Sequence, residues 1–167
     1  MLMETSPKEA ISLENLHARV QRLEDETLIR DLTYRYADAA NRVDATLFAS
    51  LWTENSEWLI GPPVNLAFEG RENIVQAFRQ LLGRWDFFVQ QPVGGNLNIE
   101  GDRATAYFYV NEVARGQDGG GNYNLAQYAD QLVKREGKWY FQRRDYRVIY
   151  LDQAPLKGTA FHPPSAH

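Results

Sequence analysis

The sequence contains no cysteine, two methionines and three histidines among its 167 residues. Without cysteine the chain can form no disulfide bond, no cysteine-ligated zinc site and no thiol nucleophile, which fits a reducing cytoplasm. The histidines are His17, His162 and His167, near the two ends of the sequence. Neither they nor the acidic residues show the spacing of metal ligands, so we expect no metal site and a cofactor-independent protein.

Excess positive charge and long apolar runs are also absent. The formal net charge is -4 at pH 7, which gives no electrostatic attraction for nucleic acid or an anionic membrane. No stretch is long and apolar enough to cross a bilayer, and the charged first 23 residues do not resemble a signal peptide. We therefore expect a cytoplasmic protein that binds neither membranes nor nucleic acid.

Aromatic residues, in contrast, are plentiful, with four Trp, nine Tyr and eight Phe. Such rings fill a core or line an apolar ligand pocket. The length suits one domain, and a hydrophobic content of 44% is that of a folded protein. We predict a mobile tail over 1–11, a single domain over 12–154 and an irregular tail, rich in proline, over 155–167.

The first half of the sequence has the periodicity of helices. Large apolar residues recur at gaps of three and four at Leu13, Leu16, Val20 and Leu23, and the stripe continues through Ile29, Leu32 and Tyr36. This pattern predicts a helix over about 12–41, or two helices if Asp25 begins a second one. Two further helices are expected over Ala45–Trp52 and Arg71–Leu82, the second ended by Gly83.

The second half of the sequence has the composition of strands separated by turns. A short strand over Glu57–Ile60 and an extended piece at Phe68–Gly70 precede it. The expected strands of the second half are 87–90, 96–100, 104–115, 124–135 and 138–150. Gly116–Gly121 and Glu136-Gly137 join the last three as hairpins. The order of elements predicts an α+β fold, in which three N-terminal helices cover a curved antiparallel or mixed sheet.

Several short motifs in this order resemble the SnoaL-like branch of the nuclear-transport-factor-2-like superfamily. They are Tyr34–Asp38, Asp44, Leu51-Trp52, Glu57-Trp58, Phe68–Gly70, Gly95-Asn96, Glu136–Phe141 and Arg143–Asp145. The resemblance covers about 23–155 and includes hexachlorocyclohexane dehydrochlorinase, bile-acid 7α-dehydratase and scytalone dehydratase. It implies a cone-shaped α+β barrel with an active site inside the cone.

The same resemblance implies where catalytic residues lie. The family's catalytic aspartate falls on Asp44, and an arginine of the dehydrochlorinase falls on Arg144. The family's histidine, however, is replaced by Pro92, and Ala39 stands where relatives have Tyr or Lys. Asp44 would then act as the base without histidine, because burial in an apolar cavity makes a carboxylate more basic. Asp130 completes an Asp-Arg-Asp group with Asp44 and Arg144.

Each of these residues also has a purely structural interpretation. Asp44 precedes a predicted helix and suits an N-cap equally well. The turn at Glu136-Gly137 sets Asp130 opposite Arg143 or Arg144, which favours a cross-strand ion pair. Five aromatic residues could line a pocket or simply fill the core, namely Tyr36, Trp58, Phe88, Tyr128 and Tyr146. Asn96 could offer its amide to a substrate oxygen.

The resulting hypothesis is a cofactor-independent lyase or isomerase acting on a small apolar molecule. One alternative is a non-catalytic binding or accessory protein, and another is the small subunit of a ring-hydroxylating dioxygenase. The apolar stripe over 13–23 lies ahead of most of the part that resembles the family. We therefore expect a second subunit to cover it in a homo-oligomer, with a trimer favoured over a dimer.

Overall fold

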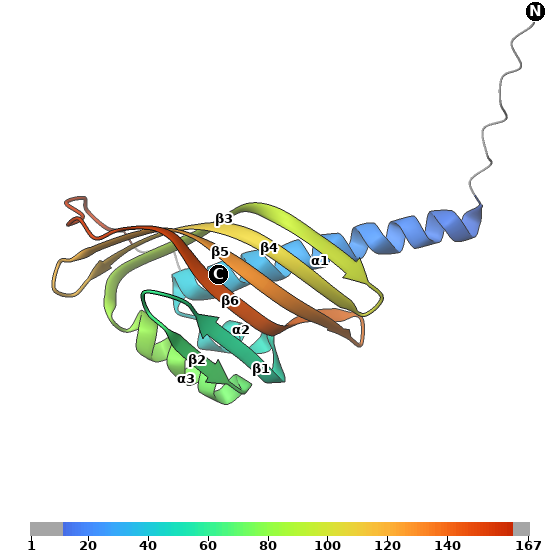
Figure 1. Ribbon diagram of the computed structural model, residues 1–167, viewed down its shortest axis with the longest axis horizontal. Helices are drawn as coiled ribbons and strands as arrows, with labels where there is room; N and C mark the ends of the chain where they lie inside the picture. Colours follow the sequence, from blue (N-terminus) through green and yellow to red (C-terminus); the bar gives the residue numbers. More distant parts are fainter. Residues whose placement is uncertain (1–11, 162–167) are drawn as a thin grey trace, which may run out of the picture.

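The computed structural model describes residues 12–161, and this part of the chain forms three helices and a six-stranded sheet (Figure 1). The tail predicted over 1–11 lies outside the described residues, as do 162–167 with His162 and His167. Residues 153–161 contain neither helix nor strand. None of the described helices is both long and apolar enough to span a lipid bilayer.

Helix α1 runs without a break over Leu13–Arg42. Its N-cap is Ser12, whose hydroxyl accepts a hydrogen bond from the Asn15 amide at 3.1 Å. The alternative in which Asp25 begins a second helix is wrong. Asp25 is buried inside α1 instead, and its carboxylate accepts a hydrogen bond from the Trp139 indole and pairs with Lys134, both at 2.8 Å.

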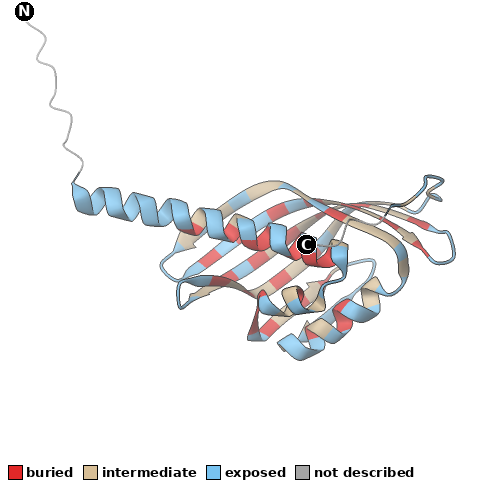
Figure 2. Cartoon of the chain, turned by 180° about the vertical axis from the view of Figure 1, so that it is seen from behind, coloured by how far each residue is buried: buried red, intermediate tan, exposed pale blue. Residues whose placement is uncertain are grey.

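The two halves of α1 lie in different surroundings. From Ile29 onward one face is buried against the sheet, whereas every residue of 13–24 is exposed. Figures 1 and 2 show this first half projecting beyond the sheet. The exposed residues include the apolar stripe at Leu13, Leu16, Val20 and Leu23, which are 45–85% accessible. Nothing in the described chain covers this stripe.

The two shorter helices follow the predicted order. Helix α2 covers Ala45–Ser50 and ends earlier than predicted, because Trp52 already belongs to a strand. Helix α3 covers Arg71–Leu82 as predicted, and it buries Ile74, Ala77 and Phe78 on one side. Together α2 and α3 cover the part of the sheet around the first strand.

The sheet has the strand order β2-β1-β6-β5-β4-β3. The strands are β1 (Trp52–Ile60), β2 (Leu66–Glu69), β3 (Trp85–Glu100), β4 (Arg103–Gly116), β5 (Gly121–Arg135) and β6 (Lys138–Asp152). All pairs are antiparallel except β1 with β6. The α+β class is confirmed, but β2 and β3 do not pair with each other. The sheet is therefore unclosed, not a complete barrel, and Figure 1 shows that it is curved.

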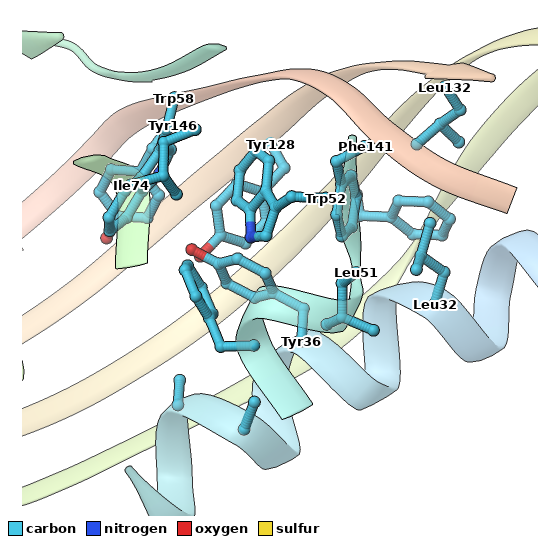
Figure 3. Close-up of a cluster of buried hydrophobic side chains, with 14 of the residues drawn as sticks. Leu32, Tyr36, Leu51, Trp52, Trp58, Ile74, Tyr128, Leu132, Phe141 and Tyr146 are labelled. Atoms are coloured by element: carbon cyan, nitrogen blue, oxygen red, sulfur yellow. The ribbon is translucent and has the colours of Figure 1, made fainter. Parts of the chain in front are cut away.

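Side chains on the inner face of the sheet alternate regularly with exposed ones. On β4 the buried side chains are those of Ala104, Ala106, Phe108, Val110, Glu112 and Ala114, and Gly116 is buried as well. The inner face meets Tyr36 of α1, Phe48 of α2 and Trp52 of β1 in one aromatic core (Figure 3). Five of these six β4 side chains are apolar, and Glu112 is the exception.

Candidate functional site

A cavity of about 320 Å³ lies between the helices and the inner face of the sheet. Much of its wall is aromatic and aliphatic, as is usual for sites that bind small molecules. Its polar lining residues are fewer, and three of them lie side by side on β3, β4 and β5. These are Gln90, Glu112 and Asn124, which we call the polar row.

The polar row is held together by the Glu112 carboxylate. The Gln90 side-chain amide donates to Oε2 of Glu112 at 3.0 Å, and the Asn124 amide donates to Oε1 at 3.0 Å. Gln90 also donates to the Tyr128 hydroxyl at 2.7 Å. Two amides, one from each of the strands that flank β4, thus fix the Glu112 carboxylate between them.

Helix α1 also holds the polar row in place, through Asn41. The Asn41 side chain accepts a hydrogen bond from the Gln90 backbone amide at 2.7 Å and donates one to the Gln90 carbonyl at 3.0 Å. An asparagine can pair with a backbone in both directions at once because it carries a donor and an acceptor. Asn41 therefore holds β3 in the position from which Gln90 reaches Glu112.

Glu112 is an unusual carboxylate because it is only 9% exposed and lacks a cation. Among the ion pairs formed within residues 12–161, none includes Glu112. Burial raises its pKa above the ordinary value of 4.5, while the hydrogen bonds from Gln90, Asn124 and Tyr146 act in the opposite direction. A carboxyl group in this setting is a stronger base than one in water.

Three tyrosines extend from the core into the cavity wall. The ring of Tyr128 lies 5.4 Å from that of Tyr36 and 5.3 Å from that of Tyr146. Burial raises the pKa of Tyr36 to about 12, and burial together with nearby Glu112 raises the pKa of Tyr146. Tyr146 therefore stays protonated near neutral pH. Its hydroxyl is buried next to Glu112 and Asn124, whose side chains also act on its pKa through hydrogen bonds.

Behind these rings lies an ion pair that does not line the cavity. Asp130 and Arg144 are paired across β5 and β6, and two nitrogens of the guanidinium bind the two carboxylate oxygens at 2.8 and 2.7 Å. Both side chains are fully buried. The guanidinium also lies 3.8–4.2 Å from the ring centres of Tyr36, Tyr128 and Phe141. Although burial opposes its charge, Asp130 raises the pKa of Arg144.

The residues predicted from the sequence fall into two groups. The aromatic residues Tyr36, Trp58, Phe88, Tyr128 and Tyr146 all line the cavity. Asp130 and Arg144 form the expected cross-strand pair, buried beneath this wall.

The other predictions need correction. Asn96 is exposed on β3 and does not line the cavity. Asp44 is exposed too, and its carboxylate caps α2 by accepting the amides of Thr46 and Leu47 at 3.0 and 2.9 Å. The N-cap interpretation of Asp44 is confirmed, and the idea that it is buried in an apolar cavity is wrong. Pro92 and Ala39 do not line the cavity either.

Sequence reasoning missed the polar row, although a signal for it exists. On β4 the residues Ala104, Ala106, Phe108 and Val110 are apolar at every second position, and Glu112 continues this series. Because side chains alternate between the two faces of a strand, Glu112 must face inward with them. The signal for the polar row is thus a charged residue at a position where the alternation places buried apolar side chains.

A larger hollow of about 590 Å³ lies at the opposite ends of β4 and β5. Exposed polar and charged side chains such as Glu100, Arg103 and Arg135 form much of its wall, so it belongs to the outer surface. Within residues 12–161, no three His, Cys, Asp or Glu side chains are grouped in a way that could hold a metal ion. The smaller cavity is therefore the candidate site.

Solved structures with this fold include two dehydrochlorinase- and dehydratase-type proteins. The type 3 hexachlorocyclohexane dehydrochlorinase of Novosphingobium barchaimii has a TM-score of 0.75 and 22% identity, covering 87% of this chain and 99% of that one. A scytalone-dehydratase-like protein of Novosphingobium aromaticivorans has a TM-score of 0.74 and 17% identity, covering 85% and 99%. At such identities the likeness establishes the fold alone.

A third structure, an NTF2-like protein of Novosphingobium aromaticivorans, is 26% identical with a TM-score of 0.68, covering 89% of this chain and 93% of that one. No curated protein matches the sequence. The profile of the SnoaL-like domain, however, matches residues 21–145, which is most of the chain. The chain therefore belongs to the SnoaL-like family, within the NTF2-like fold.

Proposed function

We propose that the protein is a cofactor-independent lyase or isomerase that acts on a small, largely apolar molecule held in the cavity. The observation that carries this proposal is Glu112, a buried carboxylate without a cation in the wall of an aromatic cavity. Burying a charged group without a counterion is unfavourable, and such groups are common at functional sites. The role of base, which the sequence assigned to Asp44, passes to Glu112.

The proposed chemistry begins with the transfer of a proton from a substrate carbon to a Glu112 oxygen. Each carboxylate oxygen accepts one amide hydrogen bond and keeps a second lone pair for this proton. In a lyase the electron pair of the broken C–H bond forms a C=C bond as the leaving group departs from the neighbouring carbon with its bonding electrons. In an isomerase the pair is delocalised onto an adjacent carbonyl oxygen, and Glu112 returns the proton to another carbon. Tyr146, which lies beside Glu112 in the cavity wall, would donate a hydrogen bond to an oxygen that gains charge.

Arg144 has an indirect part in this proposal. Its guanidinium is bound to Asp130 and covered by the rings of Tyr36 and Tyr128, so it does not reach a ligand. It holds these two rings in the cavity wall. Arg144 and Asp130 are positioning residues.

The test uses two carbon acids that need no knowledge of the natural substrate. Conversion of 3-cyclohexen-1-one to its conjugated isomer is followed by ultraviolet absorbance, and deuterium uptake by 2-tetralone is followed by NMR. We expect the full chain to accelerate at least one of these reactions above buffer. The Glu112→Gln variant keeps the shape of the side chain but should lose about 100-fold or more of the rate.

The matched control is Asp44→Asn, which alters the exposed carboxylate that caps α2. It should retain the activity of the unchanged protein. If Asp44→Asn abolished turnover while Glu112→Gln did not, the assignment of the base would be wrong. If the unchanged protein accelerated neither reaction, the enzyme proposal would give way to a binding or accessory protein. Copurification with a larger iron-containing subunit would favour a dioxygenase small subunit.

We also propose that the protein is a cytoplasmic homo-oligomer, with a trimer favoured over a dimer. The exposed stripe at Leu13, Leu16, Val20 and Leu23 supports this, because covering a large apolar side chain stabilises by roughly 1.5–3 kcal/mol. Replacing Leu16 and Val20 by Glu should reduce the mass measured by light scattering, whereas Arg19→Glu on the same helix should not. A monomer of the unchanged chain at micromolar concentration would contradict the proposal.

A further inference from the structure

The cavity opens to solvent at one end. The residues that line it and are also exposed lie in the loop before β2, in the turn after α3 and in the chain after β6, and they are Pro63, Val64, Arg84 and Gln153. We call these residues the mouth of the cavity. Figure 1 shows the turn after α3, the β4–β5 hairpin and the chain after β6 at the same end of the sheet.

The mouth contains a cation, Arg84. Of the residues in the described chain that line the cavity, Arg84 and Glu112 alone carry a formal charge. Arg84 is exposed, whereas Glu112 is buried and bound to Gln90. The chain runs from Arg84 along β3 to Gln90, a distance of roughly 20 Å if it is extended. The positive charge and the carboxylate therefore lie at different depths of one cavity.

The acidic residue nearest to Arg84 in the sequence does not neutralise it. Asp86 is bound instead by Arg115, whose Nε lies 3.2 and 3.1 Å from the two carboxylate oxygens. Among the ion pairs formed within residues 12–161, none includes Arg84. The Arg84 guanidinium is therefore accessible to an anion from solution.

The β4–β5 hairpin holds the backbone of Arg84 at the mouth. The Gln117 side-chain amide donates a hydrogen bond to the Gly83 carbonyl at 3.1 Å, and the Gln117 backbone amide donates one to the Arg84 carbonyl at 3.4 Å. Asn122 follows this hairpin on β5 and lines the cavity as well, so it adds a neutral amide donor to the same region.

We propose that Arg84 binds a carboxylate of the ligand at the mouth, so that the site takes an apolar ring system with one acidic group on a short side chain. A guanidinium and a carboxylate fit each other through two parallel hydrogen bonds. The ring then lies among Trp58 and Phe88, with its reacting carbon towards Glu112. This inference names the substrate class of the proposed function and rests on that cavity being the site.

The two charges also determine which end of such a ligand enters first. Glu112 repels the acidic group from the interior, and Arg84 attracts it to the mouth, where it stays in contact with water. A neutral molecule of the same shape lacks this attraction. A cationic molecule has to pass Arg84 to reach the interior. A single negative charge at one end of an apolar molecule matches this arrangement.

The test is equilibrium dialysis of the full chain with three probes that share one ring system. They are 3-(2-naphthyl)propanoate, its methyl ester and 3-(2-naphthyl)propylammonium. At about 20 mM salt we expect the carboxylate to bind at least about fivefold more tightly than the ester, because only the carboxylate pairs with Arg84. At about 500 mM salt this advantage should shrink, because the pair is exposed to solvent. Hydrophobic partition alone would favour the ester at both salt concentrations.

Variants of Arg84 locate this preference at the mouth. Arg84→Gln removes the charge and should abolish the preference for the carboxylate, while the affinity for the ester stays the same. Arg84→Glu should favour the ammonium probe. The matched control is Arg79→Gln, which removes an exposed cation of α3 that does not line the cavity and should keep the preference. Thermal melts check that each variant folds. If the Arg84 variants did not fold, the salt dependence of the unchanged chain would decide the question.

The proposal is overturned if the ester or the ammonium probe binds the unchanged chain as tightly as the carboxylate at low salt. It is also overturned if Arg84→Gln keeps the preference, or if Arg79→Gln loses it equally. Binding is measured without turnover, so the outcome is separate from that of the proposed function. Carbon-acid activity without a preference for the carboxylate would remove this inference alone, and the preference without activity would remove the enzyme proposal alone.

Discussion

Asp130 and Glu112 are two buried carboxylates on neighbouring strands, and they differ in what surrounds them. Asp130 is 3% exposed and is matched by two guanidinium nitrogens of a buried arginine. Glu112 is 9% exposed and is matched by neutral groups, two amides and the Tyr146 hydroxyl, with a cavity beside it. The first environment compensates the charge within the fold. The second leaves the carboxylate available to a ligand.

This difference indicates that Asp130 is a structural acid and that Glu112 is the candidate catalytic acid or base. A buried charge with a complete partner is strongly affected by loss of that partner. A buried carboxylate without a cation gains nothing in stability from being charged, so its presence in the core calls for another role. Four acidic residues of the chain can be ordered by this reasoning.

The largest effect on stability is expected at the ion pair. Arg144→Met leaves Asp130 buried without a cation and should lower the free energy of unfolding by about 3–5 kcal/mol, measured by urea denaturation. The control is Arg143→Met, which breaks the more exposed pair with Glu57 and should cost no more than about 1 kcal/mol. Similar losses in the two variants would show that the comparison is wrong. Adding Asp130→Leu to Arg144→Met should recover much of the loss.

A smaller effect is expected at Asp25, which joins α1 to the last two strands. Asp25→Ala leaves the Trp139 indole N–H without its acceptor and removes the pair with Lys134. We expect a loss of about 1–3 kcal/mol in the free energy of unfolding, from the same denaturation measurement. The neighbouring variant Glu24→Ala changes an exposed side chain and serves as the control. Equal stability of both variants would argue against the anchoring role of Asp25.

Removing the Asp44 carboxylate should lower the free energy of unfolding, from the same denaturation measurement, by about 1 kcal/mol, the usual cost of losing an N-cap. Asp44→Ala leaves the amides of Thr46 and Leu47 without their side-chain acceptor. Asp44→Ser, which can also cap a helix, should restore most of this stability. A loss of catalysis in the serine variant, with stability intact, would revive a chemical role for Asp44.

The smallest effect is expected at Glu112, and its sign depends on pH. Burial raises the folded-state pKa above 4.5, so the stabilisation from the protonated carboxyl is fully present below pH 4.5 and is lost as pH rises through the folded-state pKa. Glu112→Gln removes this dependence. The variant should therefore be at least as stable as the unchanged protein at pH 7.5, with an advantage that grows from pH 4.5 upward in thermal melts. A destabilised variant at pH 7.5 would make Glu112 a structural acid like Asp130.

The sequence predicted most of the fold because local patterns determine most of its elements. Arg71–Leu82 has an amphipathic repeat ended by Gly83, and the structure has this helix at the same residues. The turn at Glu136-Gly137 joins β5 to β6 as expected, with positive φ at both residues. The alternative of a helix starting at Asp25 is wrong. Aspartate is a common N-cap, but the partners of Asp25 are Lys134 and Trp139, which lie far along the chain.

The candidate site was only partly predictable for a related reason. The aromatic wall could be named from composition and resemblance, but the carboxylate could not be found in that way. Resemblance pointed to Asp44, which caps α2 at the surface. Glu112 could have been found from the alternation on β4. Its partners Gln90 and Asn124, however, come together only through the registers of three strands.

The parallel pairing of β1 with β6 has a consequence for the timing of folding during synthesis. Trp52 of β1 pairs with Phe141, and Glu57 pairs with Arg143, so the first strand finds its place only after β6 has left the ribosome. Likewise, Asp25 of α1 cannot accept its hydrogen bond from Trp139 until β6 has been synthesised. Contacts of such sequence separation slow folding and leave apolar surface uncovered until they form. A nascent chain that ends before β6 should therefore hold its helices and first strand without a closed core, which makes it a candidate for chaperone binding.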